Sequence, residues 1–244
     1  PERAEFVPPP ETEVSGLMED LCAFLAREDV PAIIQAAVVH AQFETIHPFA
    51  DGNGRVGRAL IHVILRRRGL TPKFVPPVSL VLATNATRYV EGLTAFRTAD
   101  PLTWCRTFLR TLYAATEHAK RFNADLLAMQ GRWREATGHP RSDSAAERII
   151  QVLPAHPVVN ADSAQALIGA SAVSVRGALN ELNEAGVLKQ VSIGRRNRVW
   201  EATELLHLVD DFEWTLATPT LSGIERRPSP PRQAAEPTGP PPSP

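Results

Sequence analysis

The chain has 244 residues, with 26 Lys and Arg against 27 Asp and Glu, and a net charge of -1. This balance excludes a broadly basic protein that coats nucleic acid, although it leaves room for a local basic patch. No apolar run approaches the roughly 20 residues that a membrane span needs, so composition predicts a soluble globular protein without a membrane partner. The length predicts one large domain or two smaller ones.

The two cysteines, Cys22 and Cys105, lie in separate apolar segments with helical patterning. Their spacing is typical of neither a disulfide framework nor a zinc site, so we interpret both as reduced thiols in the core. No signal peptide is visible, which points to the cytoplasm. The chain begins with Pro rather than Met, so we expect a fragment of a longer protein.

The N-terminal stretch from Arg3 to Val7 alternates briefly and then meets three prolines, which predicts an edge strand running into a stiff linker. Apolar residues at steps of three and four predict amphipathic helices after it. Pro48 disfavours helical backbone at His47, and Gly69 is a typical helix stop. The expected helices span residues 14–25, 32–46, 55–68, 87–98 and 101–113, with a long helical run ending near 136 and a loop at 47–54.

Composition indicates a domain boundary at Thr137–Pro140. Helical patterns follow at 144–153, 163–168 and 173–185, and then strand-like segments at 188–193 and 198–201. From Ala217 onward, proline is frequent and large apolar side chains are few, which predicts disorder. We therefore divide the chain at 1–125, a connecting helix and linker at 126–141, a second domain at 142–212 and a Pro-rich tail at 213–244.

The segment His47–Arg58, HPFADGNGRVGR, carries the strongest chemical signal. Gly52 and Gly54 permit positive φ and close approach, so the amides of this turn can form a nest around a phosphate. The same amides open the next helix, whose N-terminus favours an anion. Arg55 and Arg58 lie three residues apart, so both guanidiniums can reach neighbouring phosphates.

An acid beside such a site would repel its ligand unless a cation lay between them. Asp51 therefore predicts bound Mg²⁺, shared between this carboxylate and phosphate oxygens. Histidine can accept a proton near neutral pH, so His47 is the natural general base. A helix N-cap loop with a structural histidine is the alternative, and the grouping of all these features within twelve residues argues against it.

The segment resembles the signature of the Fic (filamentation induced by cAMP) family, His-x-Phe-x-Asp/Glu-Gly-Asn-Gly-Arg-x-x-Arg, at every specified position. The resemblance runs from Ala4–Pro9 through His40–Ile46 to Arg88-Tyr89 and Trp104, roughly the first half of the chain. It implies a mainly α fold in which a Fic helical domain with a short β flap precedes the second domain.

Fic enzymes typically transfer AMP from ATP to a protein hydroxyl on Ser, Thr or Tyr and release pyrophosphate. The resemblance implies that Phe49 anchors the loop in the core. The Doc branch, which phosphorylates its targets, departs at the Gly-Asn-Gly positions that this chain retains. The other implied roles are target deprotonation by His47, Mg²⁺ binding by Asp51, α-phosphate stabilisation by Asn53 with the amides of Gly52 and Gly54, β-phosphate binding by Arg55 and γ-phosphate binding by Arg58.

The stretch Glu5, Phe6 and Val7 resembles the second strand of the family's flap, which clamps a target by strand addition. Many relatives carry an inhibitory helix whose glutamate pairs with the second arginine, here Arg58. Its motif does not occur upstream of the flap in this chain. We expect the full-length protein to carry that helix and the fragment to be de-inhibited.

Several residues have a plain structural interpretation beside a functional one. Tyr89 occupies a position where the family often lines the adenine pocket, and core packing is an equal alternative. His40 and Glu44 could orient the loop, but a satisfied core histidine and a helix-end carboxylate are the favoured interpretation. The run Arg66–Arg68 is favoured as a solvated helix end over a nucleic-acid patch.

The second block resembles a small winged helix-turn-helix domain, with a recognition helix from Ser171 to Glu184 and a basic wing at Gly194–Arg198. The helix carries one cation and two acids, so a protein-interaction, dimer or structural role is favoured over DNA contact. We expect Ser171, Ser174, Arg176 and Asn180 to point outward and Val173, Val175, Leu179 and Leu182 to pack inward.

The sequence thus predicts a protein adenylyltransferase that uses ATP and Mg²⁺ on a protein substrate. Three alternatives stay open: a nucleotide-binding regulator acting through its winged helix, an enzyme that removes AMP, and one that uses another nucleotide. The presence of His47 favours an enzyme, because a pure binder has no need of a base.

Overall fold

The structure is a computed structural model that describes residues 6–72, 74–191 and 198–217. Within these residues the chain is mainly helical with one small sheet. The elements in order are α1 Glu11–Ala26, α2 Ala32–Ile46, α3 Asn53–Arg67, α4 Val78–Thr84, α5 Ala86–Arg97, α6 Pro101–Ala136, α7 Ala145–Val152, β1 Val158–Asn160, α8 Ala161–Ile168, α9 Ala172–Glu184, β2 Lys189–Gln190, β3 Val199–Glu201 and α10 Thr203–Ala217.

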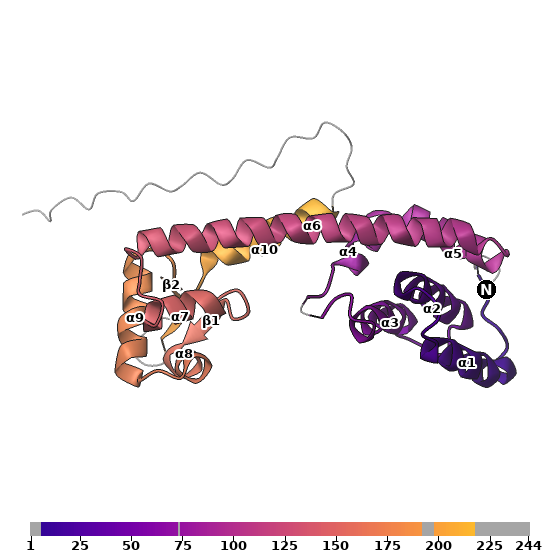
Figure 1. The fold of residues 1–244 in the computed structure, drawn as a ribbon, viewed down its shortest axis with the longest axis horizontal. Coiled ribbons are helices and arrows are strands. Elements are labelled where there is room, and N and C mark those ends of the chain that lie inside the picture. The colour runs from indigo at the N-terminus through magenta and orange to yellow at the C-terminus, as the bar shows by residue number, and fades with distance from the viewer. Residues whose placement is uncertain (1–5, 73, 192–197, 218–244) are drawn as a thin grey trace, which may run out of the picture.

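Helix α6 is 36 residues long and runs the length of the molecule (Figure 1). Pro101 occupies its first turn, and the Asp100 side chain caps it by accepting from the Thr103 amide at 3.1 Å. Helices α1, α2 and α3 lie under one end of α6, and α7, α8, α9 and the sheet lie under the other. The separate helical patterns expected at 101–113 and up to 136 therefore form one continuous helix.

The first core lies between α1, α2, α3 and the N-terminal half of α6. Phe43, Trp104 and Phe108 are its largest buried side chains. The Trp104 indole nitrogen donates to the Ala37 carbonyl at 2.7 Å, so its one polar atom is satisfied inside the core. Helix α2 is buried on most of its surface because it lies at the centre of this layer.

The second core is built from α7, α8, α9, the sheet and the C-terminal end of α6. The sheet has the order β1-β3-β2, and both pairings are antiparallel, with Val159 opposite Trp200 and Lys189 opposite Glu201. Arg134 of α6 forms a forked ion pair with Glu147 of α7, with N–O distances of 2.8 to 3.1 Å. This pair holds the second core against the end of α6.

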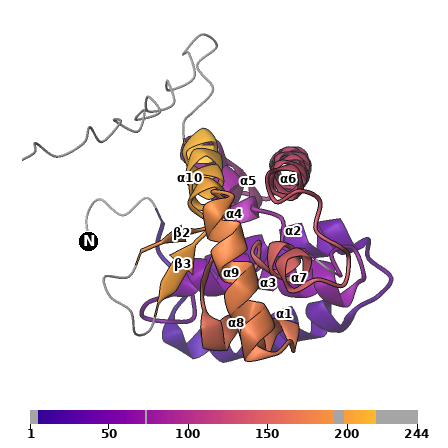
Figure 2. The ribbon, with the colours of Figure 1, turned by 90° about the vertical axis from the view of Figure 1, so that its left-hand side faces the viewer.

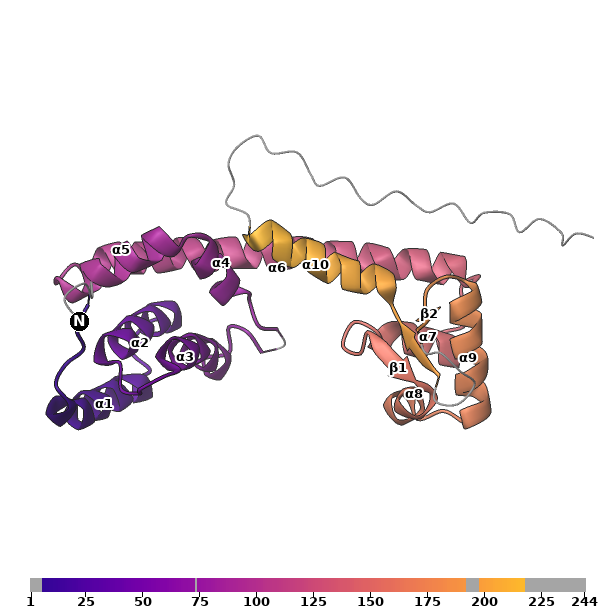
Figure 3. The same ribbon diagram turned by 180° about the vertical axis from the view of Figure 1, so that it is seen from behind.

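Helix α10 connects the two cores, lying beside α6 and contacting α4 (Figures 2 and 3). Leu205, near its start, is buried in the second core, and Leu216, near its end, is buried in the first. Phe212 packs against Phe122 of α6, with ring centroids 4.7 Å apart. The second domain is expected from the sequence to end at 212 with disorder from 213 onward; this is wrong for 213–217, which form the end of α10 and bury Leu216 in the first core.

The expected helices at 14–25, 32–46, 55–68 and 87–98 match α1, α2, α3 and α5, with small shifts at their ends. The sequence analysis missed α4, β1 and α10, which are short or take their packing surface from distant segments. Within the described residues, no helix combines the length and the apolar character required to cross a membrane.

Two burial predictions are wrong, and the expected edge strand does not cover all of its predicted range. Cys22 is exposed rather than buried in the core, and Val173 is 80% exposed because it points away from α7 and α8 at the start of α9. Phe6 and Val7 have no strand backbone, so the expected edge strand does not extend over them, and 3–5 lie outside the described residues. In α9 the remaining expectations hold: Val175, Leu179 and Leu182 are buried, and Ser171, Ser174, Arg176 and Asn180 are exposed.

Candidate active site

The segment from His47 to Gly52 is the turn between α2 and α3. His47 ends α2 in the left-handed conformation, with φ 51° and ψ 56°, and its amide donates to the Phe43 carbonyl at 2.9 Å. A left-handed residue at this position redirects the chain and costs energy in a non-glycine residue. His47, the first residue of this turn, is exposed to solvent.

Asn53 holds the turn together from within. Its side chain is buried; Oδ1 accepts from the Phe49 amide at 2.9 Å and Nδ2 donates to the Phe49 carbonyl at 2.6 Å. Both polar ends of the Asn53 amide are therefore used to close the loop. Phe49 itself is 50% exposed and touches Phe43 at its edge, so the expectation that it anchors the loop in the core is wrong.

Gly52 is the residue before α3 and has φ 87°, as the nest requires. No side chain caps α3, so the first amides of the helix face the loop without a side-chain acceptor. Gly54 lies inside α3 and does not have a positive φ. Its lack of a side chain therefore matters because it lets an anion approach the backbone closely. An anion at this helix end would meet backbone donors and the positive end of the helix dipole.

Two guanidiniums lie over these glycines. A methyl group added to Gly52 would come within 3.5 Å of Arg55 Nη2, and one added to Gly54 within 3.0 Å of Arg58 Nη1. Arg55 also pairs with Asp51 at 3.2 Å, with both side chains strongly exposed. An exposed pair of this kind contributes little stability, so Arg55 can exchange Asp51 for an anionic ligand at small cost.

Asp51 offers one exposed carboxylate, and its Oδ1 accepts from the Gly52 amide at 2.6 Å. No group of three or more His, Cys, Asp or Glu side chains within the described residues could hold a metal by itself. A single hard oxygen ligand still fits Mg²⁺, which keeps several waters and is commonly bound by one or two carboxylates plus substrate phosphates. The donor set therefore suits a metal that arrives with a phosphorylated ligand.

A layer of buried polar side chains lies directly beneath α3, the helix that carries Arg55 and Arg58. His40 Nε2 is 3.0 Å from the Tyr89 hydroxyl, and the imidazole stacks on Trp104. Burial lowers the pKa of His40 to about 4, and burial also raises the pKa of Glu44 and of Tyr89. The nitrogen Nδ1 of His40 and Oε1 of Glu44 have no hydrogen-bond partner within the described residues. His40 is thus a core histidine, as favoured, but only half satisfied.

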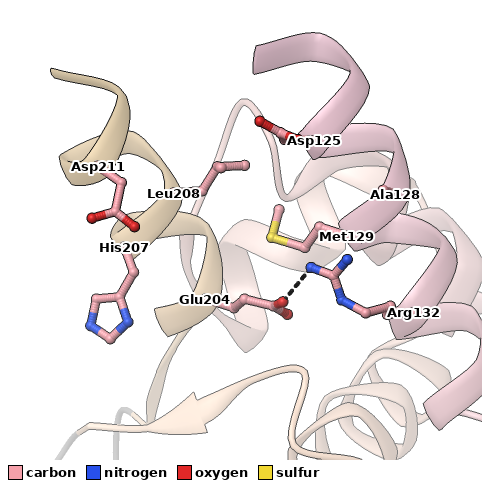
Figure 4. Close-up of a pocket in the computed structure, with 8 residues that line it drawn as sticks. All are labelled: Asp125, Ala128, Met129, Arg132, Glu204, His207, Leu208 and Asp211. Carbon is pink, nitrogen blue, oxygen red and sulfur yellow. Dashed lines mark hydrogen bonds and ion pairs between the residues drawn. The ribbon is translucent and has the colours of Figure 1, made fainter. Parts of the chain in front are cut away.

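Tyr89 packs against the first core, beside His40 and Trp104. It lines a cavity of about 240 Å³ between α4, α5 and α6, and none of the lining residues belongs to the segment His47–Arg58. Its hydroxyl faces His40. A second pocket, between α6 and α10, is lined by Arg132 with its partner Glu204 and also lacks residues of that segment (Figure 4).

Arg66 and Arg67 at the end of α3 are exposed, as expected for a solvated helix end, while Arg67 and Arg68 also hydrogen-bond to neighbouring segments. Arg67 donates to the Leu25 carbonyl, and Arg68 donates to the Arg27 and Glu28 carbonyls at 3.3 and 2.9 Å. These bonds satisfy one carbonyl in the last turn of α1 and two carbonyls just beyond its end. Arg68 also reaches Gln35 at 3.0 Å, so this end of α3 fastens α1 to α2.

Sequence reasoning missed Arg97, the last residue of α5. Its Nη2 donates to the Glu44 carbonyl at 3.3 Å, and its Nε donates to Thr45 Oγ1 at 3.4 Å. The guanidinium carbon lies 3.6 Å from the centroid of the Phe6 ring. Arg97 is 50 residues from His47 in the chain, and no motif relates them, so only the tertiary structure could identify it.

The family model described as "Fic/DOC family" matches residues 1–65. The chain is 43% identical over 68 residues to a probable protein adenylyltransferase of Aquifex aeolicus, covering 28% of this chain and 21% of that protein. It is 34% identical over 89 residues to a protein adenylyltransferase of Caenorhabditis elegans, covering 35% and 16%. The chain spans about a fifth of the length of these curated relatives or less.

A crystal structure of a Fic family protein from Desulfovibrio desulfuricans G20 is 25% identical to this chain and covers 82% of it and 59% of that protein. The TM-score is 0.45.

Proposed function

We propose that this chain, whose residues 1–65 match the Fic/DOC family model, transfers AMP from ATP to a hydroxyl side chain of a target protein. One observation carries the proposal: an exposed histidine at the end of α2 borders an uncapped helix N-terminus that two guanidiniums overhang. This arrangement combines a proton acceptor with a polyphosphate site. The names of the relatives in Aquifex and Caenorhabditis agree with it.

In this proposal the phosphates lie against the amides that open α3. Arg55 and Arg58 bind the β- and γ-phosphates, since their guanidiniums already lie over Gly52 and Gly54. Asn53 keeps the turn closed through its two bonds to Phe49, so the amide donors stay preorganised. Phosphoryl-type transfer depends mainly on positioning and charge stabilisation, which these groups provide.

His47 takes the proton from the target hydroxyl as its oxygen attacks the α-phosphorus, and the bond to the pyrophosphate oxygen breaks. Its exposed position lets a protein side chain approach it from solvent. Asp51 would hold Mg²⁺, which when bound supplies charge neutralisation on the α- and β-phosphates. Glu5, Phe6 and Val7 would receive the target segment, and Phe6 and Val7 lie at least partly exposed for this role.

The test is incubation of the protein with a cell lysate, Mg²⁺ and ATP labelled on the adenine or on the γ-phosphate. Transfer of the adenine label without the γ-label supports AMP transfer, and His47→Ala should reduce the rate by about 100-fold or more. Equal labelling by wild type and His47→Ala would refute the assigned base. Transfer of the γ-label would indicate phosphorylation instead.

Two further arms address the alternatives. CTP, GTP and UTP compete for the same phosphate site, so the preferred nucleotide is found by direct comparison of their transfer rates. Incubation with a protein already carrying AMP measures removal. Nucleotide binding without any transfer would favour the regulator.

We also propose that the second core is a winged helix-turn-helix unit that acts in protein contact rather than DNA binding. On α9, Glu181 and Glu184 are exposed beside a single cation, Arg176, and Gly194–Asn197 of the wing lie outside the described residues. Within the described residues, Arg176 is the one cation of α9, and a single cation on the recognition helix neutralises too few phosphates for tight DNA binding. Micromolar binding to a random DNA duplex that weakens steeply with salt would contradict this proposal.

A further inference from the structure

We propose that Arg97 is a positioning residue that couples the N-terminal segment at Phe6 to the orientation of His47. The inference deepens the proposed function, since it concerns the base and the segment assigned to target binding. It rests on the contacts of Arg97 with α2 and with Phe6.

Helix α2 ends one residue before the base. The last carbonyls of a helix lack an intrahelical partner, and a cationic side chain can satisfy them. The Phe43 carbonyl is taken by the His47 amide, and the Glu44 carbonyl accepts from Arg97. Arg97 also donates to Thr45, whose hydroxyl in turn donates to the Ala41 carbonyl at 2.7 Å. One guanidinium thus fastens the last turn of α2.

This turn has a conformation that needs support. His47 is left-handed, and such a conformation costs energy in a residue with a β-carbon unless its surroundings enforce it. Arg97 is the last residue of α5, and Asn53 is the first residue of α3. The last turn of α2 is therefore held by Arg97, and the loop that follows it is held by Asn53.

The same guanidinium also lies over the aromatic ring of Phe6. A distance of 3.6 Å from the guanidinium carbon to the ring centroid is close for a cation–π contact, which is attractive out to about 6 Å. Arginine suits this position because its edge can donate hydrogen bonds while its face stacks. A lysine could keep the charge but could not do both at once.

Arg97 therefore contacts both Phe6 in the N-terminal segment and the turn that orients His47. Binding of a target to the N-terminal segment can affect the orientation of the base through this one side chain. When a target segment presses Phe6 onto Arg97, the guanidinium is held against Glu44 and Thr45. Loss of Phe6 leaves the guanidinium face in water, where its hydrogen bonds to α2 compete with solvent. Arg97 touches neither ATP nor the reacting atoms in this scheme, so it acts only through His47.

Two measurements on the intact chain test this inference. The first is hydrogen exchange of the His47 amide, which reports the last turn of α2 whether or not the protein transfers AMP. We expect exchange to accelerate about tenfold in Arg97→Gln and to a smaller extent in Phe6→Leu, with amides near Ala36 unchanged. The double variant should match Arg97→Gln alone, since Phe6 acts through Arg97.

The second measurement is steady-state transfer of AMP. Arg97→Gln should lower kcat about tenfold with the KM for ATP unchanged, and Arg97→Lys should recover only part of the loss. A residue that merely stabilises the fold would not change kcat per folded molecule. Failure of the proposed function would appear as absence of transfer in the wild type, while the exchange result would still decide the present inference.

Arg27 provides a matched control. It also lies over an aromatic ring, that of Phe24, with 5.6 Å from the guanidinium carbon to the centroid, but it follows α1 and its guanidinium donates to Asp29 rather than to the last turn of α2. Arg27→Gln should leave both the His47 exchange rate and kcat at wild-type values. Unchanged His47 exchange in Arg97→Gln, or strictly additive effects of the Phe6 and Arg97 substitutions, would overturn the inference.

Discussion

His40 shows how burial changes the chemistry of one side chain. The imidazole is fully buried between Tyr89 and Trp104, and burial lowers its pKa to about 4, with Arg58 lowering it further and the Gly57 backbone opposing both. Glu44 lies on the same helix face and has its pKa raised, again by burial. Two titratable groups beneath the phosphate site are thus both driven toward their neutral forms.

A pH dependence of stability follows from His40. Its pKa is about 4 in the folded chain and about 6.5 in the unfolded chain, so the unfolded chain binds more protons between these values. The contribution is fully present above the unfolded pKa and is lost as pH falls. Between about pH 7.5 and about pH 5, the loss should be about 2 kcal/mol.

Urea unfolding of wild type and His40→Gln at both pH values measures this contribution. Glu44 works in the opposite direction, because its raised pKa favours proton uptake by the folded chain, and it is common to both proteins. The difference between the two proteins therefore isolates His40. Equal losses in wild type and variant would show that His40 is not held neutral by the fold.

Gly57 illustrates what governs the packing of two elements. Within the described residues helices α2 and α3 make the most extensive contact between two elements, and Gly57 of α3 lies close to Glu44 and His40 of α2. A methyl group there would be 2.5 Å from Glu44 Oε1 and 3.2 Å from His40 Nδ1. The Fic signature leaves position 57 unspecified. In this chain, the buried side chains of His40 and Glu44 restrict it to glycine.

Gly57→Ala should destabilise the fold by about 1–3 kcal/mol, because α2 and α3 must separate or the buried polar groups must move. Gly131→Ala in α6 is the control: nothing lies within 4 Å of the added methyl group, so helix propensity should stabilise it by about 0.5–1 kcal/mol. Thermal unfolding of both variants checks the two opposite signs. A neutral Gly57→Ala would show that the space above Glu44 is free.

Helices whose apolar residues recur at a regular spacing could be predicted from the sequence. Short elements whose positions depend on the surfaces that they pack against could not. The apolar repeat in α1, α2, α3 and α5 follows from steps of three and four, and Gly52 follows from turn chemistry. Helix α4 has only seven residues, and β1 and β2 are three and two residues long, too short to show a period. Their positions depend on the surfaces they cover.

At the scale of the whole molecule, α10 decides how the two cores relate. It begins at Thr203, where Glu204 accepts from Arg132 at 2.6 Å and from the Trp133 indole at 2.7 Å. Near its end, Leu216 is 3% exposed and lies inside the first core. Helices α6 and α10 thus form two connections between the first and the second core and run in opposite directions.

Leu216→Ala should destabilise the first core by about 2–5 kcal/mol, the usual cost of removing a buried leucine side chain. Glu213→Ala, on the exposed side of the same helix, should change stability by less than about 0.5 kcal/mol. Hydrogen exchange should show lower protection in α2 and unchanged protection in α9 for Leu216→Ala. Loss of protection confined to α9 would contradict this assignment of α10.

The sequence by itself determined the chemistry of the loop. A twelve-residue segment brings a base, an acid, a nest and two arginines together, and residues so close in the chain lie together in any fold that keeps the helix boundaries. The tertiary structure decided the rest: Arg97 beneath Phe6, His40 and Glu44 beneath Gly57, and α10 across both cores. These contacts join residues far apart in the chain, so they depend on packing that no local pattern encodes.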